Sequence, residues 1–447
     1  MSGVFSFTSY TFDEQNGLLS FRYTVQNDGE SHSFEEKYIF DTCFLPLSEE
    51  KRKVLDRVFF LFHIAAGISY YKAFVSDTVS VDSGRLTQEE ASFFTTFYFK
   101  GLGEFFCRND LPLKKIDFPF KAQVSEPVLK EKLKKRCLLP IGGGKDSALS
   151  LELLKESFKK EDILPVSCGM VRPIAQTIQA SGLPSSLLIR REISPNLIAL
   201  NKEGKVFNGH VPVTGIFAFL LLACGILYDY AFVVMSCEKS ANAATRLYKG
   251  EEVNHQWSKS FEFESLFNTL SRKLVPDFSY FSLLRPLSEL KIAYLFSKYG
   301  SPYFPVFTSC NKAFKLDKEK RLDRWCADCD KCRFVFLCLA AFMDKETLIK
   351  IFGKNMLDDE TQEKGFKELL GLSGYKPFEC VGEVDESRLA FLLLCEREEF
   401  QNDVIVKKLK DKISFQEKAS LYQRFFSVEP SCFIPAEFQN VVQRFKE

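Results

Sequence analysis

A glycine-rich turn between a strand and a helix constrains this chain more than any other feature. Residues 137–141 are apolar and predict a buried strand, and residues 148–154 have their apolar side chains at helical spacing. Between them, Gly142, Gly143 and Gly144 allow backbone N–H groups to face a ligand without a side chain in the way. Because the free N–H groups at the start of a helix attract anions, this unit predicts a phosphate-binding loop.

The residues after the glycines distinguish between known phosphate-binding loops. A Walker loop needs Lys followed directly by Ser or Thr, but Asp146 separates Lys145 from Ser147. The dinucleotide-binding fingerprint needs a third glycine where Ser147 stands. The segment instead resembles the Ser-Gly-Gly-x-Asp-Ser loop of the PP-loop ATP pyrophosphatases, with Gly142 in place of the first serine. An ordinary turn between a strand and a helix is the alternative.

Length and charge narrow the class of protein. A chain of 447 residues predicts two or three domains. The 60 basic residues balance 59 acidic ones, which disfavours a nucleic-acid partner bound by bulk electrostatics. The N-terminus has no signal-peptide pattern, so we expect a cytoplasmic protein with reduced cysteines. Asp229 interrupts the apolar stretch 215–235, which therefore predicts a buried helix and a buried strand and not stable membrane insertion.

Three parts follow one another along the chain. Residues 1–125 alternate like strands around an Asn-Gly turn at 16–17 and include a helical stretch, which predicts an α+β domain. Residues 136–340 alternate strands and helices, which predicts an α/β domain with a parallel sheet. Residues 341–447 read mainly as helices, and the charged segment 125–136 predicts a helix that joins the first two parts.

Polar loops follow three of the expected strands. They are the glycine loop, residues 236–243 (SCEKSANA) and residues 308–314 (TSCNKAF), the last after an expected strand within 302–310. Ligands of parallel sheets bind beyond the carboxyl ends of the strands. We therefore expect these three loops to converge on one site.

Four cysteines have the spacing of a metal site. They are Cys310, Cys326, Cys329 and Cys332. Four thiolates suit one tetrahedral zinc ion, and an iron–sulfur cluster is the chemical alternative because spacing alone does not select the metal. Saturated thiolates after the last expected strand favour a structural role. The alternative is free cysteines in the core, which is how we interpret the other ten.

Several polar residues near the expected strand ends are candidates for chemistry. His210 precedes a proline-led helix and His255 lies in a polar loop, where capping or core roles are the alternatives. Residues 236–239 combine Ser, Cys, Glu and Lys at the end of a strand. Arg285 precedes a helix and could bind a carboxylate or phosphate, or form a surface ion pair.

Motifs spread over nearly the whole chain resemble one PP-loop family, the MurL-type UDP-N-acetylmuramoyl-L-alanyl-L-glutamate epimerases. Within the ATP unit they are GGGKDS, GHVPVT, MSCEKSAN, VNHQWSKS, LRPLSEL, SCNKAF and WCADCDKCRFVF. Outside it they are AGISYYKA, GLGEFFCRN and FECVGEVDE. The cysteines also resemble those of the zinc-binding deazaguanine nitrile synthases, another PP-loop group. The resemblance implies a Rossmann-like parallel sheet of the adenine nucleotide alpha hydrolase type.

The resemblance also implies a reaction. A bacterial cytoplasmic enzyme of peptidoglycan precursor synthesis would convert the terminal L-glutamate of UDP-MurNAc-L-Ala-L-Glu to D-glutamate with ATP and Mg²⁺. Removing the α-proton beside a free carboxylate would place two negative charges side by side. Joining that carboxylate to AMP, with release of pyrophosphate, removes this obstacle. The functional partner would be a ligase that adds L-glutamate to UDP-MurNAc-L-Ala.

Residue roles follow from the resemblance. Gly142, Gly143, Gly144 and Ser147 would hold the pyrophosphate, Lys145 would neutralise it, and Asp146 would orient Mg²⁺. Proton transfer needs a group whose pKa lies near the operating pH; the candidates, in order, are His255, His210 and Cys237. Candidates for binding the carboxylates or phosphates of the substrate are Glu238, Lys259 and Arg285. In the N-terminal part, Tyr70, Tyr71 and Lys72 would either recognise the sugar nucleotide or belong to the core.

Two other functions fit parts of the sequence. Another PP-loop enzyme could use the same adenylation to make a nitrile or an amide, or to thiolate tRNA. A non-catalytic, zinc-stabilised nucleotide-binding scaffold would explain the cysteines and the glycines. It would not require the Lys-Asp-Ser triplet at 145–147.

Overall fold

The computed structural model describes residues 3–27, 29–44, 46–122, 124, 126–244, 246–315, 318–374, 381–429 and 433–447. The chain forms two compact units, and each collects separated segments of the chain. Unit 1 comprises Met1–Leu138, Leu187–Val233 and Ala241–Tyr280. Unit 2 comprises Leu139–Ser186, Val234–Ser240 and Phe281–Glu447. The division into 1–125, 136–340 and 341–447 stays a prediction.

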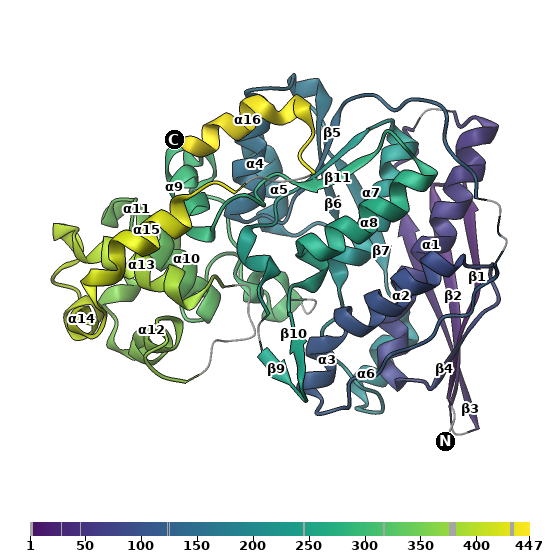
Figure 1. The fold of residues 1–447 in the computed structure, drawn as a ribbon, viewed down its shortest axis with the longest axis horizontal. Coiled ribbons are helices and arrows are strands. Elements are labelled where there is room, and N and C mark those ends of the chain that lie inside the picture. The colour runs from purple at the N-terminus through teal and green to yellow at the C-terminus, as the bar shows by residue number, and fades with distance from the viewer. Residues whose placement is uncertain are drawn as a thin grey trace. The chain divides into compact units, whose positions relative to one another are not determined.

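Unit 1 contains a five-stranded array, of which the sequence predicted the hairpin of the first two strands. Its strands lie in the order β7-β3-β2-β1-β4, with antiparallel pairing throughout except between β1 and β4 (Figure 1). The Asn-Gly turn between β1 and β2 is confirmed, and Gly17 takes a left-handed conformation there (φ 61°). The bounds are β1 (Val4–Asp13), β2 (Leu18–Asn27), β3 (Glu30–Ile39), β4 (Thr78–Val81) and β7 (Leu187–Glu192).

Helix α1 (Glu49–Phe74) forms the core of unit 1 by packing on β1 and β2 (Figure 1). Ser48 caps its first turn by accepting a hydrogen bond from the backbone N–H of Lys51. The helix is long and apolar enough to cross a membrane, yet 89% of its most apolar window is buried inside the protein. Burial on this scale identifies a core helix.

The apolar stretch at 215–235 lies in unit 1 as far as Val233, and its last two residues belong to unit 2. It forms buried helix α7 followed by buried strand β8, as predicted, and Asp229 makes the turn between them with φ 65°. The bounds are α2 (Gln88–Gly101), α3 (Gly103–Arg108), α6 (Pro195–Lys202), α7 (Val213–Tyr228), α8 (Phe261–Leu274), β8 (Phe232–Met235), β9 (Arg246–Tyr248) and β10 (Glu251–Val253).

The predicted helix at 125–136 is wrong, because its described residues contain no helix. The backbone N–H groups of this segment bond to other parts of the chain. The backbone N–H of Leu129 donates to the carbonyl of Leu274 over 2.8 Å, and that of Glu131 donates to the carboxylate of Glu50 over 3.1 Å. These acceptors take N–H groups that a helix would use internally.

Unit 2 contains the carboxyl ends of the strands that precede the polar loops. The strands lie in the order β11-β8-β5-β6, and β5 and β8 are parallel. The mixed α/β fold is therefore confirmed. The bounds are β5 (Cys137–Pro140), β6 (Ile163–Cys168), β11 (Ser279–Ser282), α4 (Lys145–Lys155), α5 (Arg172–Ser181) and α9 (Glu289–Tyr299).

The predicted strand within 302–310 is wrong as well. The chain forms a short 3-10 helix and then a turn, in which the N–H of Phe307 donates to the carbonyl of Tyr303 over 2.9 Å. Two prolines in this stretch provide no N–H group for a strand ladder. The strand in this part of the sheet is β11, whose short Ser-Tyr-Phe-Ser run gave no apolar signal although all four residues are buried.

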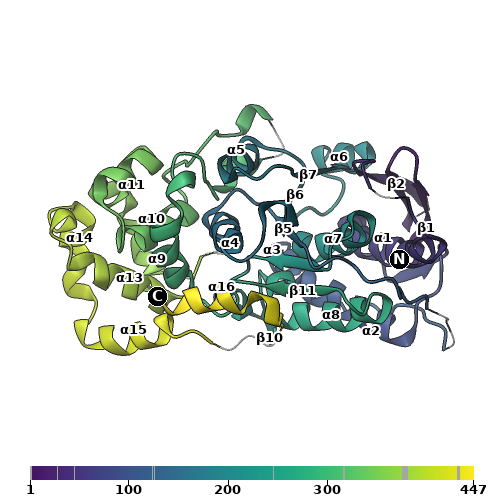
Figure 2. The same ribbon diagram turned by 90° about the horizontal axis from the view of Figure 1, so that it is seen from above.

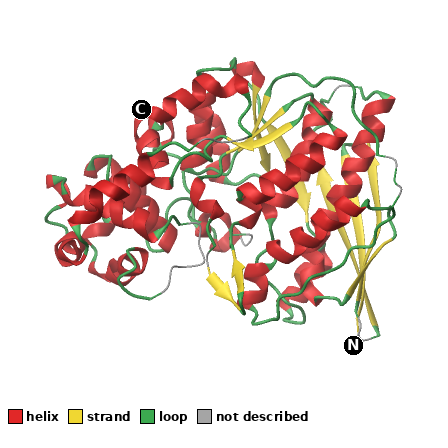
Figure 3. Ribbon diagram, in the orientation of Figure 1, coloured by secondary structure: helices red, strands yellow, loops and turns green. Residues whose placement is uncertain are grey.

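The helical C-terminal part is confirmed (red in Figure 3). Within unit 2, α10 packs against α9 and against α13 of this C-terminal part (Figure 2). The bounds are α10 (Asp330–Ala340), α11 (Lys345–Phe352), α12 (Glu363–Leu369), α13 (Val384–Cys395), α14 (Val404–Leu409), α15 (Lys418–Phe426) and α16 (Gln439–Gln443).

Candidate active site and metal centre

The glycine loop of unit 2 connects strand β5 to helix α4, as the sequence predicted. Gly143 has φ 78°, and a Cβ atom there would lie 3.1 Å from Pro173, so only glycine fits. A Cβ atom at Gly142 would meet nothing within 4 Å. The loop therefore presents an open backbone face at Gly142, where the PP-loop pattern has a serine.

Helix α4 begins immediately after the loop. Its N-cap is Gly144, which provides no side-chain hydrogen bond, so an anion can take the N–H groups of the first turn. Ser147 is buried and donates to the carbonyl of Gly144 over 3.3 Å. The N–H of Thr308 donates to the carbonyl of Gly143 over 2.9 Å, which brings the loop at 308–314 to the glycine loop as expected.

Lys145 lies between two carboxylates in unit 2. It is 3% exposed and forms ion pairs with Asp146 and with Glu289, the first residue of α9. Burial opposes its charge, but the two carboxylates outweigh burial and raise the pKa of Lys145 well above its usual value. Burial raises the pKa of Glu289, and the charges of Asp146 and Glu238 add to this effect although Lys145 opposes it.

The donor set around Lys145 fits a divalent cation. Two carboxylates face one ammonium, and the negative charge of Asp146 adds to the burial that raises the pKa of Glu289. Carboxylate oxygens beside a phosphate-binding loop are the usual partners of Mg²⁺. The sequence analysis missed Glu289, although it stands in the LRPLSEL motif.

The polar residues after β8 accept hydrogen bonds from nearby side chains of the protein. Arg285 is 7% exposed and donates to the carbonyl of Glu238 over 2.9 Å. The Ser240 hydroxyl donates to the Glu238 carboxylate over 3.0 Å, and the Ser282 hydroxyl donates to the Cys237 carbonyl over 2.6 Å. Direct substrate contacts of Arg285, Glu238 and Cys237 stay predictions.

Unit 1 holds a second cluster, formed by one carboxylate and two imidazoles. Glu104 on α3 lies with its Oε2 atom 2.5 Å from Nδ1 of His255 and 3.1 Å from Nδ1 of His210. Its Oε1 atom accepts from Arg108 over 2.5 Å. The two rings lie 5.2 Å apart between centroids. The structure thus brings together the two histidines that are 45 positions apart in the sequence and adds Glu104, which the sequence analysis missed.

The charges of this cluster favour a neutral His210 beside an ionised Glu104. Burial lowers the pKa of His210 to about 4, although Glu104 opposes the shift. Burial works against ionisation of Glu104, but the hydrogen bond from His255 and the interactions with both imidazoles and with Arg108 lower its pKa. Each Nδ1 faces a carboxylate oxygen and therefore carries the proton. Each Nε2 is then a base.

Two histidines and a carboxylate also have the composition of a metal site, since their ligand atoms lie within 4.8 Å of one another. The surrounding charges argue against a divalent cation, however. Arg108 bonds directly to Glu104, and the positive charges of Lys259 and Arg108 both lower the pKa of His210. The same charges would repel a metal ion, so the cluster suits proton transfer near an anionic ligand.

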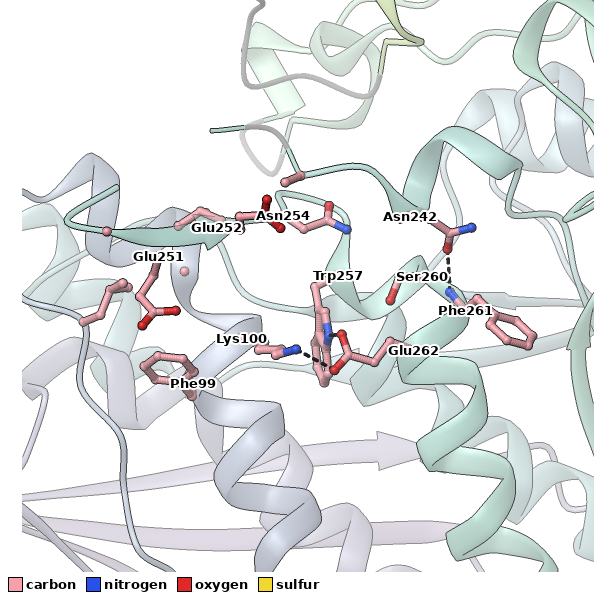
Figure 4. A pocket seen from close by; sticks show the side chains of 15 residues that line it. Phe99, Lys100, Asn242, Glu251, Glu252, Asn254, Trp257, Ser260, Phe261 and Glu262 are labelled. Carbon is pink, nitrogen blue, oxygen red and sulfur yellow. Dashed lines mark hydrogen bonds and ion pairs between the residues drawn. The ribbon is translucent and has the colours of Figure 1, made fainter. Parts of the chain in front are cut away.

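Unit 1 also contains a cavity of about 620 Å³. Gly103 and Asn254, which are next in sequence to Glu104 and His255, form part of its wall. Figure 4 shows Lys100 and Trp257 both directed at the carboxylate of Glu262, and the Trp257 indole donates to it over 2.9 Å. Aromatic rings, amides and carboxylates together suit a polar organic ligand. The sequence analysis gave no signal for this cavity.

The four predicted cysteines of unit 2 come together. Their Sγ atoms all lie within 4.8 Å of one another, and Cys332 lies 3.4 Å from Cys329 and 3.6 Å from Cys326. Zinc–sulfur bonds of about 2.3 Å in a tetrahedron place sulfur atoms about 3.8 Å apart, so the set fits Zn²⁺. Ala327 lies between Cys326 and Cys329, and its φ of 49° turns the chain between these two cysteines.

We expect Cys329→Ser to lower the bound metal to well below one ion per chain and the Tm by at least about 5 °C, because a saturated metal centre stabilises the fold around it. Elemental analysis, absorbance and differential scanning calorimetry would measure both and would distinguish zinc from iron. Cys43→Ser, at an exposed cysteine, is the matched control. A Cys329→Ser protein with full metal content would contradict the assignment.

Family models and individual relatives of the same family match this chain over most of its length. The model for the MurL N-terminal domain matches residues 1–283, and that for the MurL C-terminal domain matches residues 306–423. The UDP-N-acetyl-alpha-D-muramoyl-L-alanyl-L-glutamate epimerase of Xanthomonas oryzae pv. oryzae is 38% identical over 91% of this chain and 88% of its own length. The epimerase of the same name from Salinispora tropica is 41% identical over 92% of this chain and 89% of its own. The chain belongs to the MurL family.

Proposed function

We propose that this protein is an ATP-dependent epimerase that converts the terminal L-glutamate of UDP-MurNAc-L-Ala-L-Glu to D-glutamate in bacterial peptidoglycan precursor synthesis. The names of its relatives support this substrate and the isomerase class. One observation supports the ATP-dependent part of this proposal: the chain contains both a site suited to ATP and a site suited to proton transfer. A glycine loop with a carboxylate pair beside it, suited to a phosphate and a divalent cation, accompanies a carboxylate–imidazole cluster suited to proton transfer.

Adenylation makes the proton transfer feasible. A carboxylate oxygen of the glutamate attacks the α-phosphorus of ATP, and the bond to the β-phosphate breaks with release of pyrophosphate. The α-proton of the acyl-adenylate then passes to a base, and the electron pair spreads into the neighbouring carbonyl. Return of a proton to the other face inverts the centre. Water then cleaves the acyl-phosphate bond and releases AMP.

The glycine loop would serve the first step, as in the PP-loop fold. The N–H groups of Gly142, Gly143 and Gly144 and the hydroxyl of Ser147 would bind the pyrophosphate. Lys145 would neutralise its charge. Asp146 would orient Mg²⁺, and Glu289 supplies a second carboxylate on the other side of Lys145.

The cluster in unit 1 would serve the second step. His255 is the first candidate for the base and His210 the second, because Glu104 holds Nδ1 of both rings and leaves Nε2 as the basic atom. The low pKa of His210 keeps it neutral at physiological pH. Cys237 is the third candidate, and its thiol would need a lowered pKa.

The remaining roles concern binding and stability. Lys259 would attract the carboxylates of the glutamate, and Arg285 and Glu238 would line the ATP side. The four cysteines would hold a structural zinc ion. The substrate is the product of a ligase that adds L-glutamate to UDP-MurNAc-L-Ala, so that ligase and this enzyme would act in sequence in the cytoplasm.

The test is an incubation of the pure protein with ATP, Mg²⁺ and UDP-MurNAc-L-Ala-L-Glu in deuterium oxide. We expect ATP-dependent release of pyrophosphate, deuterium at the glutamate α-carbon and D-glutamate after hydrolysis. Deuterium and D-glutamate without ATP would retain the epimerase and contradict the adenylate. The absence of both would contradict the substrate and favour another PP-loop adenylating enzyme.

A further inference from the structure

Unit 1 contains a buried cation that has no carboxylate partner. Lys72, in the last turn of α1, is 5% exposed and forms no ion pair with an acidic group among the described residues. Its ammonium donates a hydrogen bond to the amide oxygen of Asn208 over 3.1 Å. By comparison, the equally buried Lys145 has two carboxylate partners.

The surroundings of Lys72 connect it to His210. Asn208 lies two residues before His210, and its side-chain oxygen also accepts from the N–H of Gly209 over 2.8 Å. The side chain of Asn109 donates to the carbonyl of Asn208 over 3.2 Å and fixes this loop to the end of α3. The ammonium thus lies under the loop that positions one of the two imidazoles.

An unpaired buried ammonium is costly for the fold. Taking the charge out of water is unfavourable unless an anion compensates it, and burial alone lowers the pKa of Lys72 to about 8. The group nevertheless remains mostly protonated at pH 7. One amide oxygen and the face of Phe105, whose centroid lies 5.9 Å from Nζ, compensate only part of this cost.

The residues that cover Lys72 on one side lie at the protein surface. Asn208 and Gly209 are exposed, so movement of the Asn208 side chain would uncover the ammonium. An ammonium has three N–H donors, and Asn208 uses one of them. A carboxylate or a phosphate oxygen is the ligand that completes such a site.

We propose that Lys72 and Asn208 form a binding site for an anionic group of the substrate, beside the loop of His210. This proposal rests on the proposed function for the identity of the ligand. Two groups of UDP-MurNAc-L-Ala-L-Glu have the required chemistry, namely a carboxylate of the terminal glutamate and the diphosphate. Lys72 is a binding residue in this scheme and takes no part in proton transfer.

The test compares Lys72→Met with wild type in both stability and binding. Removing an uncompensated buried charge leaves the free energy of unfolding in urea unchanged or increases it. The same variant raises the Kd for UDP-MurNAc-L-Ala-L-Glu, measured by calorimetry without ATP, by about tenfold or more. Lys72→Arg keeps a cation and recovers part of the affinity. A less stable Lys72→Met protein with unchanged Kd would show a merely structural lysine and overturn the proposal.

Two substrate analogues separate the two anionic groups. If Lys72 binds the glutamate side chain, replacing that residue by glutamine weakens binding to wild type but not further to Lys72→Met. If Lys72 binds the diphosphate, removing the nucleotide from the muramoyl dipeptide weakens binding to wild type but does not weaken binding to Lys72→Met any further. Equal losses in wild type and Lys72→Met for both analogues would overturn the proposal.

A further probe tests the anion site separately from the identity of the substrate, and a control variant accompanies it. Glutarate, a plain dicarboxylate, should bind wild type at least about tenfold more tightly than Lys72→Met even if the dipeptide nucleotide is not the substrate. Equal affinity of both proteins for glutarate would contradict the site. Lys114→Met is the control, because Lys114 pairs with Asp77 over 2.6 Å and its loss should lower stability without changing Kd.

Discussion

Asp146→Asn should reduce ATP-dependent release of pyrophosphate at least about a hundredfold while the protein stays folded. The side chain lies at the start of α4 beside the glycine loop and contacts Lys145. Asparagine keeps its size but removes the charge that holds Lys145 and would orient Mg²⁺. Epimerisation should fall in parallel, because the proton transfer depends on the adenylate.

The assay is pyrophosphate release with the dipeptide nucleotide, together with circular dichroism to verify the fold. Glu161→Gln, an exposed acid of unit 2 outside the loop, is the control and should leave the rate unchanged. Unchanged pyrophosphate release by Asp146→Asn would contradict the assignment of the glycine loop as the ATP site.

His255→Ala should separate the two half-reactions. Pyrophosphate release should persist, whereas incorporation of deuterium at the glutamate α-carbon should fall by about 10²- to 10⁴-fold, the usual contribution of a general base. Glu104→Gln should also lower the rate of deuterium incorporation, because the amide has no negative charge to place beside Nδ1 of His255.

Nuclear magnetic resonance of the glutamate in deuterium oxide measures the exchange, and a coupled assay measures pyrophosphate in the same samples. His32→Ala, at a histidine of β3 outside the cluster, is the control. Normal exchange in His255→Ala would transfer the assignment of the base to His210. Normal exchange in His210→Ala as well would transfer it to Cys237.

The sequence predicted those parts of the fold that depend on local pattern. The hairpin of β1 and β2 follows from alternating residues around Asn16 and Gly17, and the strand–loop–helix unit at 137–155 follows from its glycines. The four cysteines were predicted correctly as a cluster because the short spacing of three of them already limits their geometry.

The errors arise where contacts distant in sequence decide the conformation. The charged segment at 125–136 has helical composition, but Glu50 and the carbonyl of Leu274 take its N–H groups. Glu104 carries no local signal, since one acid at the start of a short helix is ordinary. Its importance is visible only when His210 and His255 are seen against it.

The interleaving of the two units has a consequence for how the chain can be made and divided. Unit 1 takes its last segment from Ala241–Tyr280, so a ribosome must pass residue 280 before the unit has all of its parts. Cutting the gene at residue 125 or 136 would leave a fragment without α7, which packs on α1. The smallest N-terminal fragment that contains a complete unit therefore ends near residue 280, close to the end of the matching MurL N-terminal domain at 283.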